Sequence, residues 1–193
     1  MENYDWFNQI RKNNIEALRS VQKAEWNVLE SFGDLNIEPL HFIFELLQNA
    51  DDQKAKKAKF IFSDTQIQFF HNGTTFKKKD VKGICGYAVK IKTHDNQKIG
   101  KFGLGFKSVY QFTDVPKIFT EVEGEPLNFL IENECVPDLI ELTDNEILNE
   151  LNQFGKTGFL FNLKTDIQDR LEEQLQTFIE KYSQKILMYL QNI

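Results

Sequence analysis

Three glycines spaced G-x-x-G-x-G, at positions 100, 103 and 105, constrain this chain more than any other feature. Glycine lets successive backbone N–H groups turn towards one point, and the run Phe106–Tyr110 that follows predicts a helix whose positive end faces that point. Such a bend is suited to bind phosphate. A Rossmann loop would need a strand before it, but residues 96–98 are typical of a polar loop. A Walker loop would need a glycine, a four-residue gap and then a Gly-Lys-Ser/Thr triplet, and the chain has no such combination.

A second stretch, Glu45–Asp52, predicts a helix with one polar stripe. The opposite side is apolar, because hydrophobic residues recur at helical spacing at Leu40, Ile43, Phe44, Leu47 and Ala50. Glu45, Asn49 and Asp52 fall within about 60° of one another around the helix axis. A solvated helix face is the alternative, but such a face usually interleaves lysine with glutamate. An amide and a carboxylate one turn apart suit Mg²⁺ and a water molecule.

Composition excludes several classes of function. The chain has 193 residues, which predicts one domain with a sizeable core, and its net charge of −6 argues against a broad surface for nucleic acid or acidic lipid. The amino terminus is polar and acidic and no apolar run approaches a membrane span, so we expect a cytoplasmic protein without membrane contact. Cys85 and Cys135 have no metal or redox spacing, which favours two buried thiols.

The remaining periodicity predicts an α/β protein. We expect helices over 4–31, 80–85, 144–154 and from 166 to the end, and strands over 60–62, 66–70, 115–120, 127–131 and 157–164. These elements indicate a two-layer sandwich in which a mixed, mainly antiparallel sheet carries helices on one face.

The two motifs together resemble the GHKL ATPases, the superfamily of gyrase B, the ninety-kilodalton heat-shock chaperone, histidine kinases and MutL. Glu45–Asp52 looks like their N-box, and Ile99–Asp114 resembles the second glycine box of the chaperone branch. The doubled aspartate at 51 and 52 and the run Phe106–Val109 are most similar to the ATP-binding modules of sacsin-like proteins. The resemblance covers roughly residues 38–165 and implies a Bergerat-type ATP-binding fold.

The resemblance also implies a site for ATP and Mg²⁺. Asn49 would be the metal ligand, Glu45 the general base for the attacking water, and Asp52 would orient neighbouring groups. Amides of the bend would hold the triphosphate, and the residues of this segment are Gly100, Lys101, Phe102, Gly103, Leu104, Gly105 and Phe106. Residues 80–98 correspond to a lid over the nucleotide, with Lys92 available to meet phosphate charge.

The chain departs from the family pattern at the base-binding position. His71 stands where the family has an aspartate that accepts a hydrogen bond from adenine, so Asn72 or an ordered water would serve instead, and Gly73 would let the base approach. A hairpin-type turn without a ligand is the alternative at this position. Thr157 matches the threonine of the family's closing Gly-Thr motif, although Lys156 replaces its glycine.

These features predict three parts: an amino-terminal helical segment over 1–37, an ATP-binding domain over 38–165, and a carboxyl-terminal helix over 166–193 that leads to further domains. The first part either packs on the domain or reaches a second subunit in a nucleotide-dependent homodimer. The predicted function is Mg-dependent ATP binding with slow hydrolysis that drives conformational switching of a larger chaperone-like or regulatory protein. Two alternatives stay open: a nucleotide-binding switch without turnover, and a degenerate interaction module that binds no nucleotide.

Overall fold

The computed structural model of the chain describes residues 4–23, 40–86, 105–167, 172–178 and 180. The helices are α1 (Asp5–Lys23), α3 (His41–Asp52), α4 (Lys78–Ile84) and α5 (Asn145–Phe154), with a 3₁₀ helix, η2 (Phe106–Gln111). The strands are β1 (Ala58–Phe62), β2 (Gln66–His71), β3 (Lys117–Val122), β4 (Glu125–Glu132), β5 (Val136–Leu139) and β6 (Thr157–Asn162).

The six strands form one sheet in the order β1-β2-β6-β3-β4-β5. All of these neighbours pair in the antiparallel direction, and an isolated parallel bridge joins Phe76 to Val122. The late strand β6 is therefore inserted between β2 and β3, so that His71 lies opposite Thr157. This insertion brings three distant parts of the sequence to the centre of the sheet.

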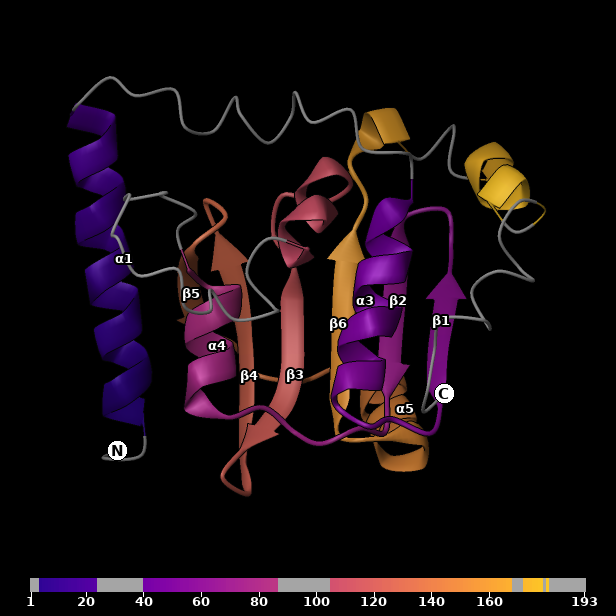
Figure 1. Cartoon of the computed structure of the whole chain (residues 1–193), viewed down its shortest axis with the longest axis horizontal. Helices are drawn as coiled ribbons and strands as arrows, with labels where there is room; N and C mark the ends of the chain where they lie inside the picture. Colours follow the sequence, from indigo (N-terminus) through magenta and orange to yellow (C-terminus); the bar gives the residue numbers. More distant parts are fainter. Residues whose placement is uncertain (1–3, 24–39, 87–104, 168–171, 179, 181–193) are drawn as a thin grey trace.

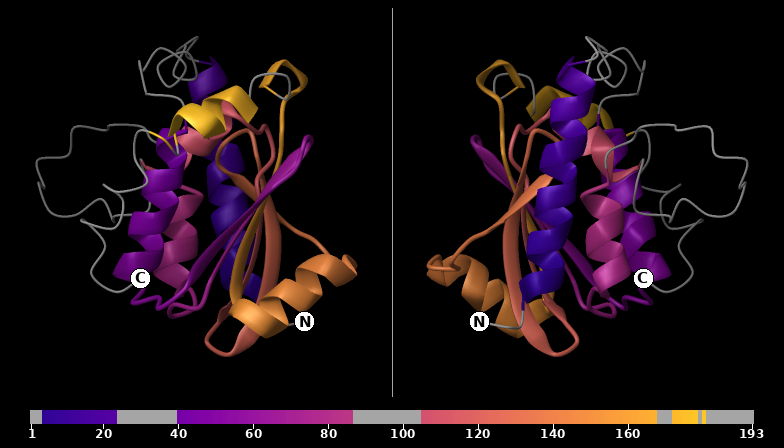
Figure 2. Two further views of the ribbon diagram at one scale, coloured as in Figure 1. Left: turned by 90° about the vertical axis from the view of Figure 1, so that its right-hand side faces the viewer. Right: turned by 90° about the vertical axis from the view of Figure 1, so that its left-hand side faces the viewer.

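The helices form layers against this sheet. In Figure 1 α3 and α4 lie in front of the sheet, and α1 runs along its β5 edge. The side views in Figure 2 show α5 on the opposite face from α3 and α4. The predicted α/β sandwich with a mainly antiparallel sheet is confirmed, but helices cover both faces of the sheet and not one, because α5 packs on the outer face.

Strand alternation divides the apolar side chains between these two faces. The main core, beneath α3 and α4, contains Ile67 and Phe69 from β2 and Phe159 and Phe161 from β6. Phe70 of β2 and Leu160 of β6, which alternate with these residues, point to the opposite face. There they form a smaller cluster under α5, and its other buried members are Phe119 and Ile147. Because successive side chains of a strand point to opposite faces, the sequence pattern of β2 and β6 specifies both clusters at once.

Helix α5 begins where the sequence predicts. Asp144 is its N-cap residue, and one carboxylate oxygen accepts hydrogen bonds from the backbone N–H groups of Glu146 (2.8 Å) and Ile147 (3.3 Å). These contacts satisfy donors that have no partner within the helix. They fix the start of α5, and Ile147 then anchors it to the outer face of the sheet.

Two elements differ from the sequence-based expectation. The helix following the glycine bend is a 3₁₀ helix of only six residues, η2. Strand β5 was not predicted, since it has four residues and contains Pro137, which lacks a backbone N–H and suits only a sheet edge. Of the predicted helix over 4–31, residues Asp5–Lys23 form α1, and residues 24–31 lie outside the described residues.

Two helical segments, α1 and residues 172–178, contact the main core. Phe7 of α1 is fully buried and its ring lies 5.5 Å from that of Phe129 in an edge-on arrangement. Near the carboxyl terminus, residues 172–178 are helical, and the Phe178 ring lies 5.1 Å from the Phe44 ring of α3. These aromatic contacts attach α1 to β4 and residues 172–178 to α3.

Candidate functional site

Helix α3 carries the predicted polar stripe, but the face that it buries differs from the one that the pattern indicated. Its most buried apolar residues are Phe42, Ile43, Leu46 and Ala50, whereas Phe44 and Leu47 are only partly buried. Asn49 lies on the same buried face of the helix and is 7% exposed. Glu45 is half-buried at the edge of this face, and Asp52 is exposed at the end of the helix. The stripe therefore runs from the core to the surface.

The Glu45 carboxylate lies against the last glycine of the predicted phosphate-binding bend. A Cβ atom placed on Gly105 would lie 1.8 Å from Glu45 Oε2 and 2.6 Å from Glu45 Cδ, so a residue with a side chain does not fit without moving Glu45. Helix α3 and η2 are in contact along this line. The acidic stripe and the carboxyl end of the bend thus meet in space, although they are far apart in sequence.

Much of the predicted phosphate site lies outside the described residues. Lys92 and the segment 100–104 belong to this part, whereas Gly105 and Phe106 are described. Phe106 is 1% exposed and packs in the core. The helix expected to point its positive end at phosphate is the six-residue η2, whose macrodipole is small because few peptide units are aligned. Backbone N–H groups, not a long helix, would have to supply phosphate binding here.

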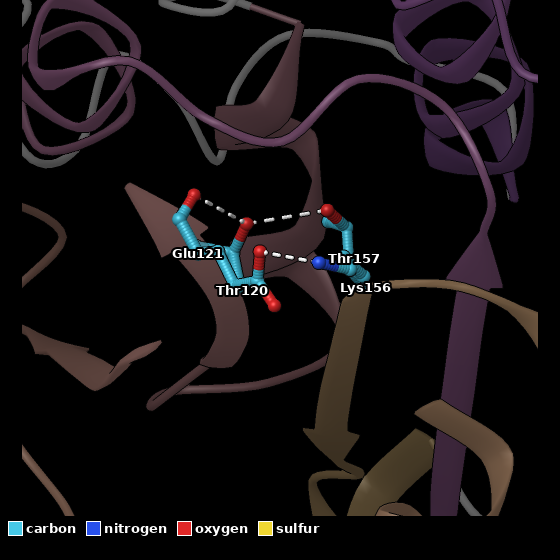
Figure 3. Close-up of polar contacts among 4 residues, drawn as sticks. All are labelled: Thr120, Glu121, Lys156 and Thr157. Carbon is cyan, nitrogen blue, oxygen red and sulfur yellow. Dashed lines mark hydrogen bonds and ion pairs between the residues drawn. The ribbon is translucent and has the colours of Figure 1, made fainter. Parts of the chain in front are cut away.

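A buried polar row crosses the sheet beneath α3 and α4. His71 (β2), Thr157 (β6) and Thr120 (β3) are 2%, 0% and 4% exposed, respectively. The Oγ1 atoms of the two threonines are 3.2 Å apart, a hydrogen bond that Figure 3 shows. Thr120 was not singled out from the sequence, because only the pairing of β3 with β6 brings it to Thr157. The row forms a polar patch in an otherwise aromatic layer.

His71 is held as a neutral imidazole. The backbone N–H of Gly73 donates to His71 Nδ1 over 3.2 Å, so Nδ1 is an acceptor and the proton of the neutral ring is on Nε2. Burial lowers the pKa of His71 from 6.5 to about 4. The ring stacks on that of Phe159 at 6.4 Å between centroids. His71 therefore cannot imitate the carboxylate that the family has at this position.

The two residues after His71 have structural partners. Asn72 Oδ1 accepts hydrogen bonds from the backbone N–H groups of Lys56 and Lys57, both at 2.8 Å. A Cβ atom on Gly73 would lie 2.9 Å from both Cβ and the backbone oxygen of Gln53. These contacts explain an amide at 72 and a glycine at 73 by packing against the turn after α3, and their contact with a base stays a prediction.

Lys156 faces away from this row. Its Nζ donates to Glu121 Oε2 over 2.8 Å on the outer face of the sheet, next to the pair formed by Thr120 and Thr157 (Figure 3). The lysine that replaces the family's glycine thus makes an ion pair between β6 and β3. Because the Lys156 side chain is 66% exposed, the contribution of this ion pair to stability is small.

Both cysteines are buried free thiols, as expected. Burial raises the pKa of Cys85 to about 12 and that of Cys135 to about 11. Within the described ranges, no three His, Cys, Asp or Glu side chains gather closely enough to hold a metal ion. None of the described helices has both the length and the apolar character needed to cross a membrane.

Known proteins share part of this sequence. A family model described as "Sacsin domain" matches residues 68–131, which run from β2 through η2 to β4. The chain is 37% identical over 156 residues to Sacsin of Homo sapiens, an alignment that covers 70% of this chain and 3% of that protein. It is 36% identical over 90 residues to Protein NO VEIN of Arabidopsis thaliana, which covers 44% of this chain and 3% of that protein.

The chain spans about 3% of the length of each of these two relatives, so it corresponds to a single small region of very long proteins. The matched segment contains the histidine of the polar row, Gly105 and the whole of η2. Together, the domain match and the two relatives support a sacsin-like family for this chain.

Proposed function

We propose that this chain is a GHKL-type domain that binds Mg-ATP and hydrolyses it slowly, and that the reaction drives conformational switching of a larger chaperone-like or regulatory protein. The observation that carries the proposal is the contact of the Glu45 carboxylate with Gly105. It brings a candidate general base to the end of the candidate phosphate-binding bend. The chain aligns with a small region of two very long relatives, which supports the proposal that it is a module acting on attached domains.

Each residue of the stripe has a role in this proposal. Glu45 would accept a proton from the attacking water, since its half-buried carboxylate lies against Gly105 at the end of the bend. Asn49 offers a neutral amide oxygen one helical turn further on, a ligand type that Mg²⁺ accepts when phosphates and waters complete its shell. Bound Mg²⁺ would neutralise phosphate charge. Asp52, exposed beyond Asn49, would orient neighbouring groups at the entrance.

Nucleotide binding is tested by thermal and urea unfolding with Mg-ATP. A ligand that binds only the folded protein adds about 2.7 kcal/mol of stability at 100 times its dissociation constant. The absence of any shift at millimolar Mg-ATP would favour the interaction module that binds no nucleotide. The neutral His71 is the observation that favours this alternative, because it removes the carboxylate acceptor expected for adenine.

Hydrolysis is tested by Glu45→Gln, which preserves the size of the side chain but not its basicity. Phosphate release is expected to fall by about 100-fold, with Mg-ATP affinity nearly unchanged, because a general base acts in the reaction and not in ground-state binding. Glu146→Gln, an exposed glutamate of α5 on the other face of the sheet, is the matched control. Equal rates for wild type and Glu45→Gln would leave a nucleotide-binding switch without turnover.

Gly105→Ala tests the contact itself. The new Cβ collides with the end of the Glu45 side chain, which is flexible and can rotate away, so the free energy of unfolding should change by less than about 1 kcal/mol. Displacement of the carboxylate should nevertheless lower phosphate release by at least about tenfold. Unaltered phosphate release in a folded Gly105→Ala variant would show that the contact has no catalytic role.

A further inference from the structure

The side chain of Lys107 is 4% exposed, although lysine is almost never found at such depth. Its Nζ donates hydrogen bonds to the backbone oxygens of Ile84 (3.3 Å) and Glu134, and it lies 5.4 Å from the centre of the Tyr110 ring. Burial lowers the pKa of Lys107. An uncharged side chain of the same length would fill this space without the cost of desolvating an ammonium group. The charge at this position therefore calls for a reason other than packing.

A second polar side chain bridges the same two places in the fold. Asn14 of α1 donates from Nδ2 to the backbone oxygens of Cys85 (2.9 Å) and Cys135 (2.8 Å). Lys107 and Asn14 thus bind the carbonyl groups of consecutive residues at two places, residues 84 and 85 at the end of α4 and residues 134 and 135 between β4 and β5. We call these four contacts the carbonyl clamp.

The carbonyl clamp is connected to the candidate site through η2. Lys107 is the second residue of η2, and Gly105, which lies against the Glu45 carboxylate, comes immediately before this 3₁₀ helix. The backbone oxygen of Gly105 accepts hydrogen bonds from the Ser108 backbone N–H (3.1 Å) and from Ser108 Oγ (2.6 Å), which closes the first turn. Any shift of Lys107 would therefore be transmitted to Gly105 over one short, hydrogen-bonded turn.

We propose that Lys107 is a positioning residue of the candidate site: by holding the carbonyls of residues 84 and 134, it fixes the first turn of η2 so that Gly105 stays against Glu45. This inference rests on the proposed ATPase function. Lys107 does not touch the phosphates in this scheme and acts only through the placement of Gly105. Its buried charge is retained for geometry, at a cost in stability.

The test compares Lys107→Met with Lys164→Met. Lys164 is the matched control because its Nζ also donates to a backbone oxygen of η2, that of Tyr110 (2.8 Å), but it is only partly buried and lies outside the clamp. The measurements are urea unfolding, Mg-ATP affinity and the rate constant of phosphate release. For Lys107→Met we expect a protein that folds, with an Mg-ATP affinity within threefold of wild type and phosphate release lowered by at least tenfold. For Lys164→Met we expect a rate within twofold of wild type.

A folded Lys107→Met variant with a wild-type rate would overturn the inference, as would an equal loss in both lysine variants. If Lys107→Met does not fold, Asn14→Ala removes the other half of the clamp, and a rate within twofold of wild type in that variant also overturns the inference. Wild-type protein that neither binds Mg-ATP nor releases phosphate would instead refute the proposed function, so the two failures are distinguishable.

Discussion

Gly155→Ala is expected to lower the free energy of unfolding by about 3 kcal/mol. A Cβ atom on Gly155 would lie 2.3 Å from the backbone oxygen of His71 and 2.6 Å from Cα of Asn72. Both atoms belong to the backbone, so the collision cannot be relieved by rotation of a side chain. The end of β2 and the start of β6 would have to separate. Urea unfolding of the purified variant measures the loss.

Glycine is needed at position 155 because there is no room for a side chain, and not because of the backbone conformation. Gly155 has φ 163°, an extended geometry open to any residue. Gly124 is the informative control, since it has φ 88° and its Cβ would meet nothing within 4 Å. Gly124→Ala should cost only about 1 kcal/mol, from the left-handed backbone alone. A loss in Gly155→Ala no larger than that in Gly124→Ala would contradict the close approach of β6 to the end of β2.

The stability of the protein is expected to fall by about 3 kcal/mol between pH 6.5 and pH 4 because of His71. The unfolded chain takes up a proton on this histidine as the pH falls below 6.5, whereas burial delays protonation of the folded protein until about pH 4. The unfolded state therefore binds more protons in this interval, and stability decreases as the pH falls. Well above pH 6.5 both states are neutral at this ring, and the contribution is constant.

His71→Asn is the comparison for this pH dependence, because its amide oxygen can accept the Gly73 N–H in place of Nδ1 and does not titrate. Carboxylates also change the stability of both proteins as the pH falls. The informative quantity is therefore the difference between the free energies of unfolding of the two proteins, followed from pH 7 to pH 4. Wild type should lose about 3 kcal/mol more than His71→Asn over this range. Parallel curves would mean that His71 is protonated equally in the folded and unfolded states.

The α/β architecture could be predicted because it depends on local periodicity. The hairpin of β1 and β2, helix α3 and the capped start of α5 all follow from patterns within a few residues. Strand β5 was missed for a local reason too. Four residues that include Pro137 carry no alternation, and only pairing with β4 defines them as a strand.

The candidate site was only partly predictable. Glu45 and Asn49 share one helix, so their common face follows from helix geometry. Thr120 gave no signal, because its importance depends on the insertion of β6 between β2 and β3. The roles of Asn72 and Gly73 in packing were hidden for the same reason, since their partners lie on the turn after α3.

The sequence by itself determined most of the segments that become helices and strands, β5 excepted, and which helix carries carboxylates beside an amide, since these properties repeat at 3.6 or 2 residues along the chain. Only the tertiary structure decided that the Glu45 carboxylate meets Gly105, that His71 is a neutral acceptor of a backbone N–H, and that Lys107 is buried between two carbonyl groups. Such contacts join residues that are far apart in the chain. Many of them involve backbone atoms, which every residue possesses, so no pattern of side chains in the sequence predicts them.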